Sequence, residues 1–272
     1  MADRPNTLLM ADAHVHFRPN YDIKTFLDAA WKNFSFVSGK LTGQSVPFAG
    51  FLLLTETLSE KRFPEWIQAA DSGQNFGGWM PVKTGDDGCL QFTDFRGREL
   101  YVVAGWQIVT SERLEILSLF CSQPVPDGLP LETSWKMILD LKGVPVIPWG
   151  FGKWSGTRKK KLIRFLENSE NRPVFLGTTR HRPKIFLETK LFRIAAQNCL
   201  SVFPGSDTLP MKGEEQMAGS FGLMIHHSGF ITPDTPATAL RSMLMAPSVS
   251  FSGYGQSETW IGFVINQVRL RI

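Results

Sequence analysis

The chain alternates between short apolar runs and stretches of helical periodicity, and this alternation constrains its fold more than any other feature. The run Phe51-Leu52-Leu53-Leu54-Thr55 is typical of a strand covered on both faces, and a helical stretch at about 60–70 follows it. Further strands are predicted at 144–149, 173–178 and 201–207, and further helices at 131–141, 158–166 and 191–199. Repeated βα units in this order favour a parallel sheet or a barrel.

Three other regions add to this pattern. A buried strand is predicted at 8–16, and Asp22 is a candidate N-cap for the helix that follows it. Between 79 and 121, turn residues separate runs rich in Val, Tyr, Phe and Ile, which predicts antiparallel hairpins. After residue 207 the pattern becomes less regular, with a strand predicted at 221–226 and helices at 238–245 and 258–268.

These elements predict an α/β fold. With 272 residues, the chain has a length normal for an α/β barrel, since such barrels commonly run to about 250 residues as one unit. We expect a distorted TIM-like (β/α)7–8 barrel with an antiparallel hairpin region at about 79–121, in which residues 1–272 form a single domain.

Composition narrows the class of protein. The first six residues lack the layout of a secretion signal, and no apolar run approaches the roughly 18 residues of a membrane span. The three cysteines form no CxxC pair, which argues against a disulfide framework and a zinc knuckle. The net charge of +4 is spread along the chain, which gives little support for nucleic-acid binding. We therefore expect a cytoplasmic protein with no membrane partner.

The sharpest chemical signal is Asp12-Ala13-His14-Val15-His16. Side chains two apart on a strand point to the same face, so we expect the three polar side chains of this motif to lie together. Two imidazoles at the mouth of a strand suit zinc, iron and similar ions, and the alternative is a pair of hydrogen-bonded surface histidines.

A second signal is Pro204-Gly205-Ser206-Asp207, in which a predicted strand ends in an acid. Barrel enzymes carry their active sites at the carboxyl ends of the strands, so Asp207 is a candidate metal ligand or base. The alternative is an aspartate that caps a helix or stabilises a turn.

Together, these motifs resemble those of the PHP (polymerase and histidinol phosphatase) metallohydrolases over most of 12–207. The family's HxH motif matches His14 and His16, and its later motifs resemble Thr55-Glu56, Gly105-Trp106-Gln107 and Ser206-Asp207. The resemblance implies a metal site made from His14, His16, Glu56 and Asp207, with Asp207 and Glu56 also the candidate catalytic residues.

This chain departs from the family pattern at several ligand positions. Gln107 stands where the family has a metal-bridging glutamate, Trp149 stands where it has a histidine, and no histidine follows Asp207 at the usual spacing. A bridging carboxylate provides the negative charge that holds two cations close together, and a neutral glutamine cannot. We therefore predict one divalent ion (zinc, manganese or iron) or none.

Other residues are candidates for binding a small anionic substrate, which could be phosphorylated. Lys153 follows a predicted strand within a glycine-rich loop, although a solvated loop lysine is the alternative. Thr178 and Arg180 follow the strand at 173–178, and Arg180 could pair with a phosphate. Asp12 is assigned to the same group. The basic run at 158–161 opens a helix, which hints at phosphate, but such runs are usually solvated.

Two functions from different classes fit these features. The first is a metal-dependent hydrolase of a phosphoester or similar bond that acts through a metal-activated water. The second is a PHP-like barrel that has lost catalysis and serves as a binding or regulatory protein, since fold does not determine function.

Overall fold

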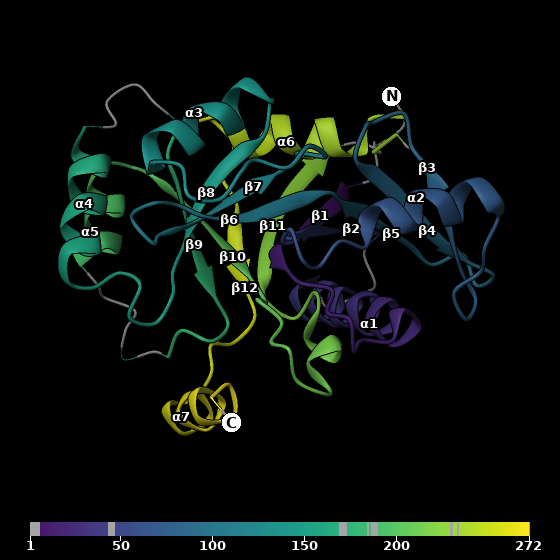
Figure 1. Cartoon of the computed structure of the whole chain (residues 1–272). Coiled ribbons are helices and arrows are strands. Elements are labelled where there is room, and N and C mark those ends of the chain that lie inside the picture. Colours follow the sequence, from purple (N-terminus) through teal and green to yellow (C-terminus); the bar gives the residue numbers. More distant parts are fainter. Residues whose placement is uncertain are drawn as a thin grey trace.

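The computed structural model describes residues 6–42, 47–168, 173–183, 185, 190–228, 231–232 and 234–271. These residues form two mixed β-sheets with helices packed around them (Figure 1). The α/β class expected from the sequence is therefore confirmed. None of the helices in these ranges is long and apolar enough to cross a bilayer.

The larger sheet has seven strands, with β1 near its centre. In spatial order they are β12 (Ser252–Tyr254), β11 (Gly222–Ser228), β1 (Asn6–Val15), β2 (Phe48–Leu54), β5 (Glu99–Val103), β4 (Cys89–Asp94) and β3 (Trp79–Lys83). Strands β1, β2 and β5 are parallel, and β11, β12, β4 and β3 add antiparallel partners at the two edges.

The smaller sheet has five strands. They are β10 (Ser201–Gly205), β9 (Phe175–Thr179), β8 (Val144–Pro148), β7 (Glu115–Leu119) and β6 (Gly105–Val109). The β10–β9–β8 pairs are parallel, and the β8–β7 and β7–β6 pairs are antiparallel. The antiparallel region predicted at 79–121 is confirmed, because it comprises β3 to β7.

The two edge strands of the smaller sheet, β6 and β10, meet the ends of β2 and β1, which are interior strands of the larger sheet, but the described strands do not pair into a closed barrel. On one side, the Glu56 N–H donates to the Gly105 carbonyl (3.0 Å) and the Gln107 N–H donates to the Glu56 carbonyl (2.8 Å). On the other side, the Asp207 N–H donates to the His14 carbonyl (2.7 Å). These few bonds bring the ends of β1, β2, β6 and β10 together at one point.

Helices follow most of the parallel strands, as the alternation predicted. They are α1 (Ile23–Thr42), α2 (Phe63–Ser72), α3 (Leu131–Asp140), α4 (Gly156–Glu167), α5 (Lys190–Gln197), α6 (Pro236–Met245) and α7 (Trp260–Arg269), with a short 3-10 helix η2 (Glu214–Met217). The predicted cap of α1 is confirmed, since the Asp22 carboxylate accepts a hydrogen bond from the Thr25 N–H (2.8 Å).

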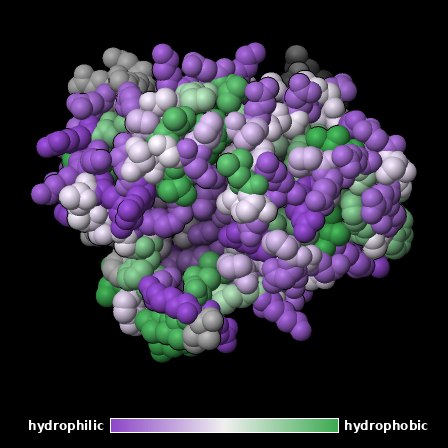
Figure 2. Space-filling model, in the orientation of Figure 1, coloured by the Kyte–Doolittle hydropathy of each residue, from purple (hydrophilic) through white to green (hydrophobic). Residues whose placement is uncertain are grey.

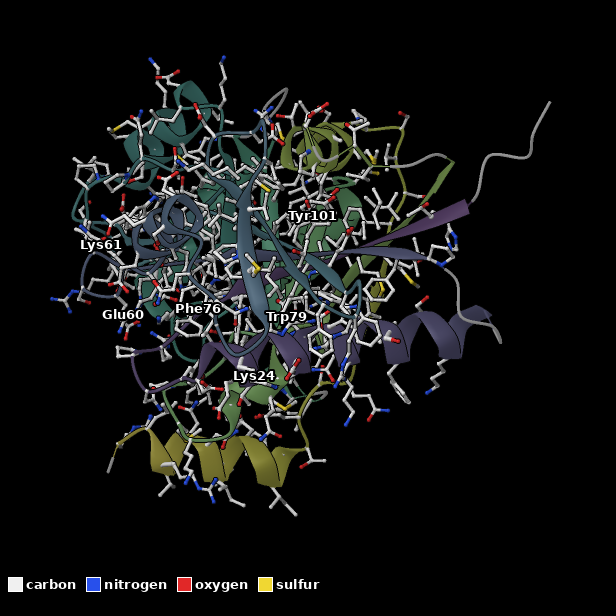
Figure 3. All side chains as sticks on the ribbon, turned by 90° about the vertical axis from the view of Figure 1, so that its right-hand side faces the viewer. Lys24, Glu60, Lys61, Phe76, Trp79 and Tyr101 are labelled. Carbon is white, nitrogen blue, oxygen red and sulfur yellow. The ribbon has the colours of Figure 1, made fainter. Side chains whose placement is uncertain are left out.

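Aromatic and aliphatic side chains fill the core. One cluster, which includes Leu53, Val146 and Phe203, contains residues of both sheets. On the outer side of the larger sheet, Trp79 of β3 packs near α1 and its indole N–H donates to Asp28 (3.1 Å), in the region viewed in Figure 3. The hairpin β3–β4 is thereby tied to α1, away from the point where the two sheets meet.

Candidate metal centre

A β-bulge near the end of β1 determines which of its side chains face the site. The register with β2 advances three residues on β1, from Asp12 to Val15, for two residues on β2. Such an extra residue resets the alternation of side chains between the two faces of a strand. Accordingly, Ala13 and Val15 belong to two different core clusters. The prediction that Asp12 shares a face with His14 and His16 is therefore wrong.

Asp12 instead holds the end of β1 from within the core. Its side chain is fully buried, and its carboxylate accepts hydrogen bonds from the N–H groups of Ser206 (2.7 Å) and Gly219 (2.8 Å). Burial raises the pKa of Asp12 to about 7, although these hydrogen bonds act in the opposite direction. Because Asp12 does not line the pocket described below, it is a positioning residue and not a contact for substrate.

His14, His16 and Asp207 converge on one point. The Nε2 atoms of the two histidines lie 3.1 Å apart, and Asp207 Oδ1 lies 3.5 Å from His14 Nε2 and 3.6 Å from His16 Nε2. One ligand atom from each residue lies within 4.8 Å of the other two. In the described part of the chain, this is the one group of His, Cys, Asp or Glu side chains arranged to hold a metal ion.

Asp207 reaches this point through a tight contact between β10 and β1. A Cβ atom on Gly205 would lie 2.3 Å from the His14 backbone nitrogen, so only glycine allows the two strands to approach this closely. Asp207 itself has a φ of 51°, an uncommon backbone conformation for a residue other than glycine. Strain of this kind clusters at functional sites.

The protonation states of the three side chains suit a metal ion. Burial lowers the pKa of His14 and the pKa of His16, so both imidazoles are neutral near pH 7. Burial alone would raise the pKa of Asp207, but the attraction of its carboxylate to the imidazoles of His14, His16 and His181 in their protonated form, and to Arg18, more than offsets this and holds the pKa below its usual range. Neutral imidazole and ionised carboxylate are the forms that bind metals. This set of two nitrogens and one oxygen suits zinc, manganese or iron.

Glu56 lies outside this group. Its Oε1 atom accepts hydrogen bonds from the N–H groups of Arg62 (2.5 Å) and Phe63 (2.9 Å), at the start of α2. A carboxylate in this position satisfies the free N–H groups of a helix and interacts favourably with its dipole. The structure thus gives Glu56 a capping role, and the prediction that it is a ligand and a catalytic residue does not fit this geometry.

Gln107 lies beside the histidines, at the end of a chain of polar contacts. Its Oε1 atom is 3.3 Å from His14 Nε2, and its Nε2 donates to Glu115 Oε1 (3.2 Å). The Lys153 ammonium forms an ion pair with the same Glu115 oxygen. Lys153 therefore places a positive charge on the side of the site where the neutral Gln107 stands in place of a carboxylate.

Arg180 and Thr178 are not arranged as predicted. The Arg180 guanidinium donates to Glu214 (2.6 Å) and Glu258 (2.9 Å), so its charge is already neutralised. Thr178 is half-buried and does not line the pocket, whereas its neighbour Thr179 does. Thr178 and Thr179 are the last two residues of β9, and neighbouring side chains on a strand point to opposite faces, so Thr179 faces the pocket and Thr178 does not.

His181 follows the same strand as Arg180 and was set aside as incidental in the sequence, but it connects this ion-pair network to the metal centre. Its Nε2 lies 2.8 Å from the Asp207 carbonyl, and its Nδ1 lies 2.8 Å from Glu258 Oε1. Burial alone would raise the pKa of Glu258, but the hydrogen bond and charge of His181, together with Arg180, lower it. An ionised Glu258 thus orients His181 against the backbone of Asp207.

The three convergent side chains open into a pocket of about 320 Å³. Arg18, Lys153, Glu115 and Glu258 are the charged side chains of its wall, in addition to Asp207. Helix α7 covers one side of the pocket with Phe263, Asn266 and Gln267. Figure 2 shows a hydrophilic hollow directly above the apolar lobe that α7 forms. Glu115 and Glu258 could not be predicted from the sequence, because their partners Lys153 and Arg180 are distant in the chain and no local pattern marks either glutamate.

Comparisons with known proteins bear on the fold. No protein-family model and no curated protein matches the chain. Among solved structures, PsfC from Pseudomonas syringae PB-5123 has a TM-score of 0.55 at 14% identity, covering 97% of this chain and 98% of PsfC. The chain shares this fold.

Endonuclease Q from Pyrococcus furiosus, a lesion-specific endonuclease, has a TM-score of 0.53 at 13% identity over 91% of this chain. A complex of Endonuclease Q with a 27-mer duplex that carries an abasic lesion at the active site has a TM-score of 0.51 at 12% identity over 92% of this chain. The alignments cover 59% and 60% of those chains, so this chain spans about three fifths of Endonuclease Q. At these identities, the likeness concerns the fold alone.

Proposed function

We propose that this protein is a metal-dependent hydrolase of a phosphoester or a similar bond, and a divergent relative of the PHP metallohydrolases. The observation that carries the proposal is the convergence of His14, His16 and Asp207 on one point at the base of a pocket. The fold shared with Endonuclease Q and the order of the sequence motifs agree with it.

His14, His16 and Asp207 would hold a single divalent ion. Such an ion supplies Lewis acidity, which activates water for attack and polarises a phosphoryl oxygen. Gln107, a neutral side chain 3.3 Å from His14 Nε2, provides no carboxylate to bridge to a second ion. The Lys153 ammonium would supply positive charge on that side of the pocket.

Lys153 and Arg18 are the residues proposed to bind the anionic part of the substrate. Both line the pocket, and each is held in place by a carboxylate, Glu115 for Lys153 and Glu60 for Arg18. Burial lowers the pKa of Lys153, and the charge of Asp207 opposes that shift. Arg180 acts indirectly, because its two carboxylate partners neutralise it.

The pocket favours a small molecule over a nucleic-acid duplex as the substrate. Its volume is about 320 Å³, and α7 covers one side of it. Pockets of roughly 300–1,000 Å³ are typical of sites for small ligands. We therefore keep a small anionic molecule, which could be phosphorylated, as the proposed substrate class, although Endonuclease Q is a lesion-specific endonuclease with a duplex substrate.

The proposal is tested by hydrolysis assays on metal-free protein to which manganese, iron or zinc is returned. We expect cleavage of at least one phosphomonoester or phosphodiester in a panel, lost by more than a hundredfold in His16→Ala. Thr178→Ala is the matched control, since Thr178 neighbours the pocket without lining it. Activity that is equal in His16→Ala and in the wild type would contradict the proposal.

A second candidate is a binding protein without catalysis, and the Lys153–Glu115–Gln107 contacts favour it. On this side of the pocket the protein has the neutral amide of Gln107 and the Lys153–Glu115 ion pair. Two-metal hydrolases need a bridging carboxylate at such a position. Binding of one metal ion and of inorganic phosphate, with no turnover across the panel, would favour this alternative.

A further inference from the structure

We propose that two copies of this chain pair through the outer face of α7, with the two helices antiparallel about a twofold axis. The outer face is an apolar stripe, formed by Ile261, Val264, Ile265 and Val268. The partner is therefore a second copy of the chain, bound on the side of α7 opposite to the metal pocket. This inference does not depend on the proposed hydrolase activity.

Helix α7 carries two stripes of side chains, and the apolar one is turned toward solvent. The inner stripe lines the metal pocket, and it consists of Phe263, Asn266, Gln267 and Leu270. The side chains of the outer stripe follow the same helical spacing and are between 41% and 71% exposed. A surface helix of a soluble monomer normally has its apolar side toward the core and its polar side toward water. The outer stripe of α7 therefore has the composition of a buried surface.

Helix α7 is short and lies at the edge of the molecule. It has ten residues, of which only Phe263 is buried, and in Figure 1 it lies below both sheets. Isolated helices shorter than about 12–15 residues are marginal in water, so a helix of this length depends on the packing of its faces. A partner that covers the outer stripe would therefore also hold the inner stripe against the metal pocket.

The exposed apolar area agrees with a weak symmetric dimer. Ile185 and Trp260 line one hollow at the start of α7, and both are exposed, so they extend the outer stripe. Together these side chains expose on the order of 500 Å², and apolar patches of a few hundred Å² or more mark interaction sites. Pairing two such patches would bury about 1,000 Å² in total, which is near the lower limit for a specific interface.

The outer stripe is suited to pairing with a copy of itself. Its four side chains are β-branched and restricted at χ1, so their burial costs little side-chain entropy. The stripe contains no charge, and the exposed Arg269 and Arg271 lie at its C-terminal end. A parallel pair would bring the arginines of both copies together. An antiparallel pair separates them, aligns the helix dipoles favourably, and places Ile261 against the partner's Val268.

A lipid surface fits this helix less well than a second copy does. Helices that lie on membranes are typically rich in Lys and Arg on the polar face, which attract anionic lipids. The polar side of α7 is the inner stripe, which has two amides and no charge and lines the metal pocket. The hydrophilic hollow above the apolar lobe in Figure 2 shows the same arrangement.

The proposal is tested by sedimentation velocity on the full chain at concentrations between about 1 and 500 µM. We expect a reversible equilibrium between monomer and dimer, with a dissociation constant of about 1–100 µM, as suits an interface of this size. Val264→Glu should raise this constant at least tenfold, because it buries a carboxylate of each copy near the twofold axis.

Val82→Glu is the matched control, because Val82 on β3 is 45% exposed and Val264 is 41% exposed. This variant should dimerise as the wild type does. Equal circular dichroism spectra of the two variants, recorded at a concentration where the wild type is monomeric, would show that both fold.

Cysteine cross-linking tests the antiparallel orientation. The background is Cys199→Ser, which removes the exposed native thiol. On oxidation, a mixture of the Ile261→Cys and Val268→Cys variants should form a disulfide-linked dimer, and either variant alone should not. Stronger cross-linking of the separate variants than of the mixture would overturn the proposed orientation.

Three results would overturn the dimer itself. They are a wild type that stays monomeric at 500 µM, a dimer that Val264→Glu leaves unchanged, and pelleting with phosphatidylserine vesicles that Val264→Glu abolishes. The last result would identify a lipid surface as the partner of α7.

Discussion

Replacing Gln107 by glutamate tests why this site is proposed to hold a single ion. The new carboxylate would lie where the Gln107 amide now lies, with the amide nitrogen 3.2 Å from Glu115 Oε1. At an effective dielectric constant of about 20, two unit negative charges at that distance repel by about 5 kcal/mol. The Lys153 ammonium, already paired with Glu115, offsets more than half of this repulsion.

The free energy of unfolding of the metal-free Gln107→Glu variant is therefore expected to be about 2 kcal/mol lower than that of the wild type. In a chain of this size, this lowers the melting temperature by roughly 4–8 °C. Manganese should restore the loss, because a second cation would be stabilised by the new carboxylate together with Glu115. The expected metal content rises from one equivalent to two.

The measurement combines thermal unfolding, with and without manganese, with elemental analysis of the loaded protein. Gln107→Met is the control, because it removes the amide without adding charge and should remain at one equivalent. If Gln107→Glu stays at one equivalent and responds to manganese as the wild type does, the reasoning about the missing carboxylate is wrong.

Three further predictions follow from the contacts around the site. Asp12→Ala leaves the Ser206 and Gly219 N–H groups without their acceptor, so the free energy of unfolding, measured in urea, should fall by about 3 kcal/mol. A decrease below about 1 kcal/mol would contradict the positioning role. Glu56→Ala removes the cap of α2, so the free energy of unfolding should fall by about 1–2 kcal/mol while the metal content stays unchanged. A loss of bound metal would instead indicate that Glu56 is a ligand. Glu258, whose pKa is held below its usual value of 4.5, contributes stability that is present above that pH and is lost as the pH falls through the lowered value. Glu258→Gln should therefore flatten the acid side of the stability curve, and an unchanged curve would refute this.

Much of the fold could be predicted from the sequence because its signals are local. Buried strands such as 51–54 and capped helices such as the one that begins after Asp22 are determined by neighbouring residues. The way the two sheets meet is different, because it depends on contacts between distant segments. The hydrogen bonds from the Glu56 N–H to the Gly105 carbonyl and from the Asp207 N–H to the His14 carbonyl join residues far apart in sequence, and no local pattern predicts them.

The sequence predicts only the part of the candidate site that depends on local signals. His14, His16 and Asp207 come together because each lies at the end of a strand, which is a property that the sequence pattern shows. Asp12 was misplaced because a single extra residue on β1 resets the alternation without changing the apolar pattern. Arg180 was taken for a free cation because its partners, Glu214 and Glu258, are distant in the chain.

We propose that the imidazoles of His14 and His16 and the carboxylate of Asp207 bind one divalent ion. This is tested by calorimetric titration of metal-stripped protein with manganese and zinc. We expect one equivalent to bind to the wild type, to be lost in His16→Ala and in Asp207→Ala, and to be retained in Glu56→Ala. A wild type that binds neither ion, or a His16→Ala variant that binds as the wild type does, would contradict it.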